Sequence, residues 1–425
     1  MKIPKLPFSK TIIDVQWAFI SIVTASLAHF ILRIVLGREL GADGLGIYTL
    51  AFTIYLFGMQ FAAFGIGAAL TKFVAQFIDD PITIRNYVSS GMTSSIITGT
   101  IMGVVLFLLA PVISISFFDV PELEPLLKLT AICYPFIAIQ KAVLGTLNGF
   151  RRMHLYALLE IIQNVAVVCI SITLVLLYGM GVMGAVVGFV VPTVVIGIIC
   201  PLLIRDSIGL DQSLWDKPTL YATTIFGLYV VMGNSIGFLN TQVDSIMLGY
   251  YLNPAEVGIY AVAVLLAQTL TLLPSAVQRI TGPTIATLHG KGDIQKIRGI
   301  IISTMKKIFL ISAALALFIA ASGQFFIEFL FKSEFLPAFT PLLILLLGQT
   351  FFSPFMAIGS TLASIGKVHI SFRIAAVCAI LNLGLNVLLI PLFGIVGAAI
   401  ATAGTLVGTF LISVIIINIM LKRII

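Results

Sequence analysis

Two segments half a chain apart carry the same pattern of residues. Leu36–Tyr48 reads LGRELGADGLGIY and Leu248–Tyr260 reads LGYYLNPAEVGIY, so Leu, Gly, Leu and the closing Gly-Ile-Tyr recur at an offset of 212 residues. Further along, PFIAI at Pro135–Ile139 is matched by PFMAI at Pro354–Ile358. The offset drifts by a few residues between these pairs, as short insertions would make it. In a strongly apolar chain, a direct repeat of this length predicts two similar lobes around one central pathway.

Composition separates a membrane protein from a soluble one. Hydrophobic residues make up 60% of the 425 residues, charged residues 10%, and the mean hydropathy is +1.15. A soluble domain has about 45–50% apolar and about 25% charged residues. Apolar windows of about 20 residues, the length that crosses a bilayer, recur twelve times. The sequence therefore predicts an all-α polytopic membrane protein with twelve transmembrane helices. They form an N-terminal six-helix lobe (1–204), a cytoplasmic linker (205–219) and a C-terminal six-helix lobe (220–425).

The lysines and arginines predict the orientation of the chain. With the N-terminus in the cytoplasm, twenty of the 24 cationic residues fall on the inner side. The outer side keeps the others, which are Arg33, Arg38, Lys128 and Lys332. Because cytoplasmic loops are enriched in Lys and Arg, both termini are predicted to be cytoplasmic. The net charge of +7 thus orients a multi-pass protein of the cell (cytoplasmic) membrane and attracts anionic lipids; it calls for no nucleic acid.

Motifs of nucleotide-driven or metal-dependent proteins are missing from the sequence. Walker A, H-E-x-x-H and C-x-x-C patterns are absent, so no ATP site, catalytic set, metal site or cofactor is predicted. Gly179–Gly184 matches G-x-G-x-x-G, but that fingerprint has meaning only between a strand and a helix. Here it joins two membrane-length runs, and we interpret it as a tight turn. Gly37 and Gly249 are expected to take the left-handed conformation that ends a helix.

Polar residues inside the spans are the candidates for function, because a charge at a membrane helix centre costs at least about 2.5–3.5 kcal/mol. In the first span, Asp14 and His29 share a small-residue stripe at helical spacing, with Arg33 one turn beyond. In the seventh span, Asn240 and Asp244 belong to a similar stripe. Both stripes favour a water-lined cavity, and helix-to-helix packing is the alternative.

Two other spans carry polar groups at helical spacing. Glu160 is followed by Gln163 and Asn164 in the fifth span, and Asn382 by Asn386 in the eleventh. For the two asparagines, hydrogen bonding between helices is favoured, at about 1 kcal/mol or less each. The groups that could bind a coupling ion, H⁺ or Na⁺, are Asp14, His29, Glu160 and Asp244.

The repeat relates one pair of charges. At the offset of 212, Arg33 aligns with Ser245, the neighbour of Asp244. The two charges therefore have nearly equal depth in equivalent helices of opposite lobes. We hypothesise that Arg33 and Asp244 approach each other near the outer mouth and help to close it.

Several matched segments point to a family. Asp244–Gly249 (DSIMLG), Glu256–Ala261 (EVGIYA) and Leu389–Thr402 (LIPLFGIVGAAIAT) resemble the polysaccharide-flippase branch of the MOP superfamily. That superfamily also contains the MATE drug antiporters and the lipid II flippases. The resemblance covers essentially the whole chain and implies a MATE-like pair of six-helix lobes around a cavity that faces either side alternately. The lipid II flippases have fourteen helices, which disfavours that subgroup for a chain with twelve.

The resemblance implies a lipid-linked oligosaccharide as cargo, moved from the cytoplasmic to the outer leaflet for surface polysaccharide or glycoconjugate synthesis. A polyprenyl chain can stay in lipid while its phosphate and sugars pass through a polar cavity. Phosphate favours cationic partners, and the nearest candidates are Arg33, Lys141, Arg152, Arg279 and Arg373. Those on the cytoplasmic side also contribute to the excess of positive charge that orients the chain. Without an ATP site, uphill transport needs an ion gradient or consumption of the product.

Two other function classes compete with flipping. The first is cation-coupled export of drugs or metabolites, as in MATE antiporters. The second is a membrane enzyme, but such enzymes carry a large hydrophilic loop, whereas the longest polar stretches here, Arg205–Thr219 and Leu288–Arg298, are short. We therefore expect a transporter and no enzyme, with membrane lipids and polysaccharide polymerases or glycosyltransferases as partners.

Overall fold

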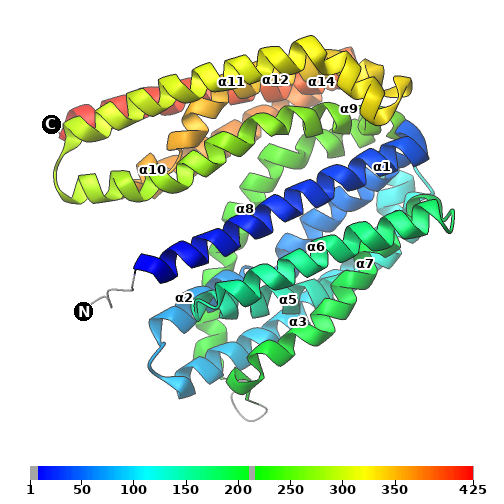
Figure 1. The fold of residues 1–425 in the computed structure, drawn as a ribbon. Helices are drawn as coiled ribbons and strands as arrows, with labels where there is room; N and C mark the ends of the chain where they lie inside the picture. Colours follow the sequence, from blue (N-terminus) through cyan, green and yellow to red (C-terminus); the bar gives the residue numbers. More distant parts are fainter. Residues whose placement is uncertain (1–7, 210–215, 425) are drawn as a thin grey trace. The chain divides into compact units, whose positions relative to one another are not determined.

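The computed structural model describes residues 8–209 and 216–424, and the regular elements in this part of the chain are all helical (Figure 1). The first half contains α1 (Phe8–Ala63), α2 (Ile66–Gln76), α3 (Pro81–Pro111), α4 (Leu123–Ala131), α5 (Cys133–Gly149), α6 (Met153–Leu176) and α7 (Gly181–Ile199). The second half contains α8 (Lys217–Tyr251), α9 (Pro254–Ala267), α10 (Leu272–Gly290), α11 (Ile294–Phe331), α12 (Phe339–Ile358), α13 (Thr361–Ser364) and α14 (Val368–Ile424). Short tight or wide helical turns lie between them at η1 (Val112–Phe117), η2 (Cys200–Ser207), η4 (Gln268–Thr271) and η5 (Ser333–Ala338).

Most of these helices are long and apolar enough to cross a membrane. Nine segments of the described chain qualify, or ten when the pair α4 and α5, bent by 43°, counts as one crossing. Large apolar side chains lie on the outside, such as Leu108 (68% exposed) and Leu388 (65% exposed). In water such a surface would aggregate, whereas in a bilayer it faces lipid. The chain is therefore a multi-pass membrane protein.

The two longest of these segments are interrupted by glycine. Gln16–Ala63 has 48 residues and Val368–Met420 has 53, well beyond the roughly 20 that one crossing needs. Gly41 in the first has φ 69°, and Gly394 in the second has φ 58°. Because only glycine takes such angles without strain, each long helix is kinked at that residue.

The prediction that Gly37 and Gly249 end helices in the left-handed conformation is wrong. Neither has a positive φ, and α1 continues from Gly37 to its kink at Gly41. α8 ends at Tyr251, and Asn253 then caps α9 with Pro254 in the first helical turn. Proline is suited to that position because it needs no N–H partner there, so this corner turns without a left-handed glycine.

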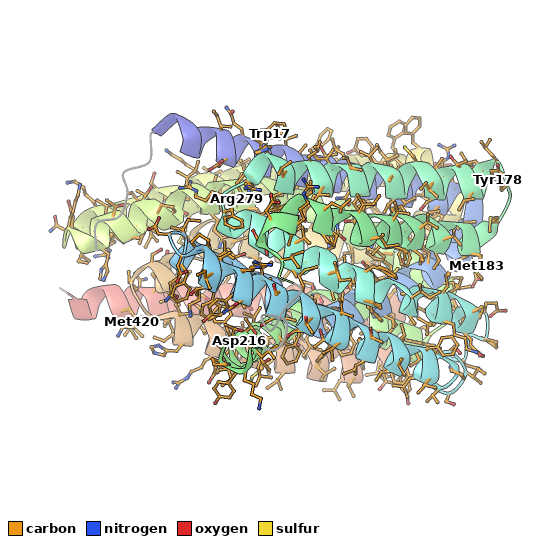
Figure 2. The ribbon with its side chains drawn as sticks, turned by 90° about the horizontal axis from the view of Figure 1, so that it is seen from below. Trp17, Tyr178, Met183, Asp216, Arg279 and Met420 are labelled. Atoms are coloured by element: carbon orange, nitrogen blue, oxygen red, sulfur yellow. The ribbon has the colours of Figure 1, made fainter. Side chains whose placement is uncertain are left out.

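The turn predicted at Gly179–Gly184 is confirmed. Gly179 and Gly181 have φ values of 61° and 55°, and the turn joins the end of α6 to the start of α7. Figure 2 shows Tyr178 and Met183, which flank the turn, at the same end of this helix pair.

Two aspartates outside the spans start long helices. Asp80 accepts hydrogen bonds from the hydroxyl of Thr83 at 2.6 Å and from its N–H at 3.2 Å, and Pro81 follows as the first residue of α3. These hydrogen bonds lower the pKa of Asp80 below its ordinary value of 3.8. Asp293 caps α11 in the same way through the N–H of Lys296. The Lys296 side chain, 2.6 Å from the carboxylate, and this N–H lower the pKa of Asp293 as well. Capping carboxylates of this kind fix where a helix begins.

The described chain divides into two compact units. Unit 1 is the chain up to Leu40 together with Ile47–Ser235, and unit 2 is Gly41–Gly46 together with the chain from Ile236 onward. The division falls inside α8, and the lobe boundaries that the sequence predicts at 204 and 220 stay a prediction. The first half of α8 belongs to unit 1 because Thr219 hydrogen-bonds Ser90 at 2.9 Å and Gly227 lies against the backbone of Phe64.

Each unit has its own core. In unit 1, α5 packs on α2 and α3, and α6 packs on α7, with Leu70, Val88 and Val143 fully buried among them. In unit 2, α12 packs against both α11 and α14 (Figure 1). Ile285, Ile297 and Leu362 are buried in its core.

The repeated segments pack against each other within unit 2. A Cβ on Gly46 would lie 1.7 Å from the carbonyl oxygen of Pro254, and one on Gly258 would lie 2.1 Å from that of Ala42. Gly46 and Gly258 correspond in the repeat, and so do Ala42 and Pro254. The contact is therefore reciprocal: the glycine of each copy accepts the backbone of the other. The Glu334 carboxylate also accepts a hydrogen bond from the N–H of Ala42 at 3.0 Å.

Candidate functional site

A carboxylate on α8 is the centre of a polar cluster in unit 2. The hydroxyls of Tyr260 and Thr402 donate to Oδ2 of Asp244 at 2.6 and 2.5 Å. Nδ2 of Asn386 donates to Oδ1 at 2.9 Å. Among the described residues of unit 2, no lysine or arginine forms an ion pair with Asp244. A membrane carboxylate is thus held by three neutral donors from α9 and α14.

Asn382 extends this cluster by one layer. Its Nδ2 donates to the hydroxyl of Thr402 at 3.2 Å, and its two oxygens accept from Asn386 at 3.0 and 3.2 Å. Oδ1 of Asn386 is buried and has no hydrogen-bond partner among the described residues. The Asp244 cluster, defined as Asp244, Tyr260, Asn382, Asn386 and Thr402, therefore gathers carboxylate, amide and hydroxyl oxygens. These are ligands that hard cations prefer.

A second polar cluster lies in unit 1, between α1, α5 and α6. Nζ of Lys141 is 4.0 Å from Oε1 of Glu160, and Nδ2 of Asn164 donates to the backbone carbonyl of Glu160 at 2.7 Å. His29 lies near the Asn164 side chain, and its ring centroid is 5.7 Å from that of Phe52. The structure thus brings together His29, Glu160 and Lys141, which the sequence predicts on three different spans.

An amide chain continues this second cluster into the helix core. Nε2 of Gln140 donates to Gln163, whose own Nε2 donates to the hydroxyl of Thr193 at 3.2 Å. Gln140 and Thr193 are each 1% exposed. Neither is among the predicted site residues, because each is a single polar residue in an apolar span without a polar neighbour at helical spacing. The one sequence feature that could have drawn attention to Gln140 is its charged neighbour, Lys141.

The same side of unit 1 contains a cavity of about 250 Å³. It lies between α1, α2, α5, α6 and the first half of α8, and we call it the Lys141 pocket. Small residues such as Gly65, Gly67 and Gly145 form part of its wall. The polar side chains that line it are those of Gln60, Thr71, Lys141, Asn148, Tyr156 and Asn234.

Asp14 has a partner that the sequence reasoning missed. Nη2 of Arg151 lies 3.1 Å from Oδ2 of Asp14, and the two side chains are 40% and 15% exposed. Arg151 has φ 56°, a left-handed conformation that no sequence pattern reveals. The next residue, Arg152, was predicted as a phosphate contact; it is exposed and lies 5.3 Å from the ring of Phe150.

The remaining candidates do not gather in one place. Arg33 is half-buried, and no carboxylate described in unit 1 forms an ion pair with it; its pairing with Asp244 stays a prediction. Asn240 donates to the backbone carbonyl of Ala375 at 3.2 Å, which ties α8 to α14. Arg279 on α10 (Figure 2) and Arg373 on α14 are exposed.

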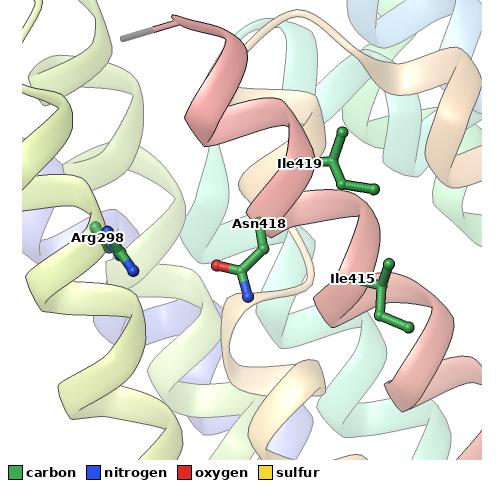
Figure 3. A pocket seen from close by; sticks show the side chains of 4 residues that line it. All are labelled: Arg298, Ile415, Asn418 and Ile419. Carbon is green, nitrogen blue, oxygen red and sulfur yellow. The ribbon is translucent and has the colours of Figure 1, made fainter.

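A shallow hollow of about 280 Å³ also lies in unit 2. Its lining consists of Arg298 on α11 with Ile415, Asn418 and Ile419 on α14 (Figure 3). With one charge and one amide among apolar side chains, it offers few groups to a ligand. The described residues also contain no group of three His, Cys, Asp or Glu side chains arranged to hold a metal ion.

Comparison with known proteins decides the family. Residues 13–289 match the family model described as "Polysaccharide biosynthesis protein". The chain belongs to this family. In the second half of the molecule, residues 229–388 of this polysaccharide biosynthesis family member also match the MatE family model.

The similar proteins agree with that assignment. The protein described as "Probable flippase AglR" from Haloferax volcanii is 26% identical over 89% of this chain and 78% of its own. An inward-facing multidrug resistance MATE transporter of the MOP superfamily has a TM-score of 0.76 at 16% identity, with 94% of this chain and 95% of its own covered. The lipid II flippase MurJ also has a TM-score of 0.76, at 15% identity, with coverage of 95% and 87%. The predicted MOP-superfamily resemblance is therefore confirmed, and this family member has a MATE-like and MurJ-like fold. These two solved structures with this fold are a MATE transporter and a lipid flippase.

Proposed function

We propose that the protein is a flippase that moves a polyprenyl-linked oligosaccharide from the cytoplasmic to the outer leaflet of the cell membrane by alternating access. The observation that carries this proposal is the polar lining of the Lys141 pocket inside membrane-spanning helices of a polysaccharide biosynthesis family member. Such a lining accommodates the hydroxyl groups of sugars, while the polyprenyl chain stays in lipid. The name of the AglR relative supports the same substrate class.

The proposal includes twelve crossings with both termini in the cytoplasm. Ten crossings follow from length and composition, and counting the kinked helices α1 and α14 as two crossings each gives twelve. Left-handed residues also recur at equivalent places in the two halves. Asp119 corresponds to Lys332, and Gly181 to Gly394. This recurrence supports a duplicated lobe, which is the architecture that alternating access requires.

We assign ion coupling to the Asp244 cluster. A carboxylate in a membrane helix is costly unless it is hydrogen-bonded or binds a cation, and here one buried amide oxygen, Oδ1 of Asn386, is left without a partner. A proton or Na⁺ bound at Asp244 would compensate the negative charge. Arg33, half-buried in α1, is the foremost candidate for contact with the phosphate.

Deletion of the gene in its host tests the main proposal. Lipid-linked oligosaccharide is expected to accumulate on the cytoplasmic leaflet, and the wild-type gene is expected to restore surface glycan. Normal surface glycan in the deletion strain would reject flipping. Because residues 229–388 match the MatE model, export of drugs is the second candidate; it predicts loss of resistance to cationic dyes with unchanged glycan.

The coupling assignment has its own test in liposomes. The Asp244→Asn variant is expected to lose the dependence of transport on a pH or Na⁺ gradient. The matched control is Asp206→Asn, because Asp206 is 95% exposed and lies outside the cluster. Unchanged gradient dependence in Asp244→Asn would remove this residue from the coupling site.

A further inference from the structure

The polar side chains of the Lys141 pocket have unused hydrogen-bonding capacity. Among the described residues, the side chains of Gln60, Asn148, Tyr156 and Asn234 show no hydrogen-bond partner within the protein. Each amide offers two donors and an acceptor, and the phenol offers one of each. The pocket therefore presents a dense set of neutral donors and acceptors to whatever enters it.

The wall of the pocket is rigid because α2 and α5 touch through glycines. A Cβ on Gly145 would lie 2.0 Å from the carbonyl oxygen of Gly67, and one on Gly67 would lie 2.4 Å from that of Lys141. The hydroxyl of Thr71 donates to the carbonyls of both Gly67 and Gly145 at 3.0 Å. Because the two backbones touch at these glycines, this wall of the pocket cannot easily collapse.

The charge of the pocket favours an uncharged ligand. Lys141, the one cation in its lining, lies 4.0 Å from Glu160, so the two charges largely cancel. A free phosphate would have to compete with Glu160 for Lys141, whereas sugar hydroxyls can accept from the ammonium group without displacing that carboxylate. Amides, tyrosine and one ammonium group together match a ring that carries several hydroxyls.

The size and place of the pocket limit what it can hold. Its volume of about 250 Å³ is below the roughly 300–1,000 Å³ of pockets for drug-sized ligands, so it suits one ring and not a whole oligosaccharide. It is lined by the last turns of α5 and the first turn of α6, close to the Asp14–Arg151 ion pair. By the predicted orientation this is the cytoplasmic end of unit 1, where a cargo would be loaded.

We propose that the Lys141 pocket binds one uncharged sugar ring of the lipid-linked cargo and so selects which glycan is loaded, an inference that rests on the proposed flippase function. Gln60, Asn148, Tyr156 and Asn234 bind the ring hydroxyls. Lys141 supplies one charged donor, and Glu160, 4.0 Å from it, offsets its charge. Phosphate recognition lies outside this pocket.

Binding to defined lipids tests the proposal. The full-length protein in lipid nanodiscs is titrated with polyprenyl phosphate, either bare or carrying a single glucose, galactose, mannose or N-acetylglucosamine. Wild type is expected to bind at least one glycosylated form about tenfold or more tightly than the bare lipid. Asn148→Ala and Gln60→Ala are each expected to reduce that preference about two- to tenfold, as loss of one neutral hydrogen bond does, with affinity for the bare lipid unchanged. Asn418→Ala, an amide change in the shallow hollow of unit 2, is the matched control.

The outcomes separate this inference from the function on which it rests. If no polyprenyl lipid binds and the gene deletion leaves surface glycan normal, the flippase function itself fails. If glycosylated lipids bind better but Asn148→Ala and Gln60→Ala keep the full preference, only the sugar subsite is rejected. If phosphatidylglycerol competes in wild type and ceases to do so in the two variants, the pocket is a lipid head-group site and the proposal is overturned.

Discussion

Alanine at Gly258 is expected to destabilise unit 2 at the point where the two repeated segments meet. The added Cβ would lie 2.1 Å from the carbonyl oxygen of Ala42 and 3.0 Å from its carbonyl carbon. Both atoms belong to the backbone, so no side-chain rotation relieves the clash. The Gly41–Gly46 segment of α1 must move away from α9 by more than about 1 Å to restore an ordinary contact.

The size of the effect follows from the kind of contact that is broken. Overpacking a well-packed site costs about 1–3 kcal/mol, and a clash with backbone belongs in the upper part of that range. For a unit of about 200 residues, each kcal/mol lowers the melting temperature by about 2–4 °C. A cost of about 2–3 kcal/mol therefore predicts a decrease of about 4–12 °C for Gly258→Ala. Gly46→Ala is expected to be at least as harmful, because its Cβ would be 1.7 Å from Pro254.

Thermal unfolding in detergent, followed with a thiol-reactive fluorescent dye, measures this decrease. Cys378 in unit 2 is buried and reports unfolding of that unit, whereas Cys169 is exposed and is replaced by serine to lower the background. Gly237→Ala is the matched control, since a Cβ there would meet no atom within 4 Å and alanine favours a helix by about 1 kcal/mol. If Gly258→Ala melts at the same temperature as Gly237→Ala, the packing argument is refuted.

Three other changes have defined outcomes. Arg33→Asp and Asp244→Arg are each expected to weaken closure of the outer mouth and together to restore it, measured as protection of a cysteine introduced there from a membrane-impermeant thiol reagent; a double variant no better protected than the single ones would rule out the pairing. Asp80→Ala is expected to lower the melting temperature at pH 7, because the pKa of Asp80 is depressed in the folded state by Thr83. That stabilisation is present above the ordinary pKa of 3.8 and is lost as pH falls through the lower folded value. The melting temperatures of the variant and of wild type should therefore differ at pH 7 and converge only as pH falls below 3.8. Asp14→Asn removes a partly exposed ion pair worth about 1 kcal/mol or less, and its effect on the melting temperature should shrink in 1 M salt.

The membrane-spanning helices could be predicted from the sequence, because each is encoded by a long, continuous run of apolar residues. Polar residues at membrane depth likewise pointed to Asp244 and Glu160. The residues that contact these carboxylates could not be predicted from the sequence. Thr402 is 158 residues from Asp244, and no spacing rule relates residues so far apart. The sequence predicted a left-handed glycine at Gly37, but the structure has it at Gly41. Both glycines are plausible helix ends, and the packing of the Gly41–Gly46 segment on α9 decides between them.

The asparagines of the eleventh predicted span show why one sequence feature can serve two interpretations. Hydrogen bonding between helices was favoured for Asn382 and Asn386, and both do bond other side chains within unit 2. Asn386, however, donates to the very carboxylate that the sequence nominated for ion binding. Asn386 therefore bridges two helices and also belongs to the candidate site. A sequence prediction that treats these two roles as alternatives cannot describe it correctly.

The repeat also shows where the two halves differ. Tyr48 and Tyr260 occupy equivalent places in the duplicated segment, but their surroundings are unlike. Tyr260 donates to Asp244 at 2.6 Å, whereas Tyr48 stacks on Phe52 with ring centroids 5.9 Å apart. The residue that corresponds to Asp244 in the first copy is Leu32, which is 1% exposed. The same tyrosine thus orders a carboxylate in unit 2 and packs among aromatic rings in unit 1. The ion site proposed at Asp244 depends on the carboxylate and not on the tyrosine, so its counterpart in the first copy, with Leu32 in place of the aspartate, lacks the proposed ligand.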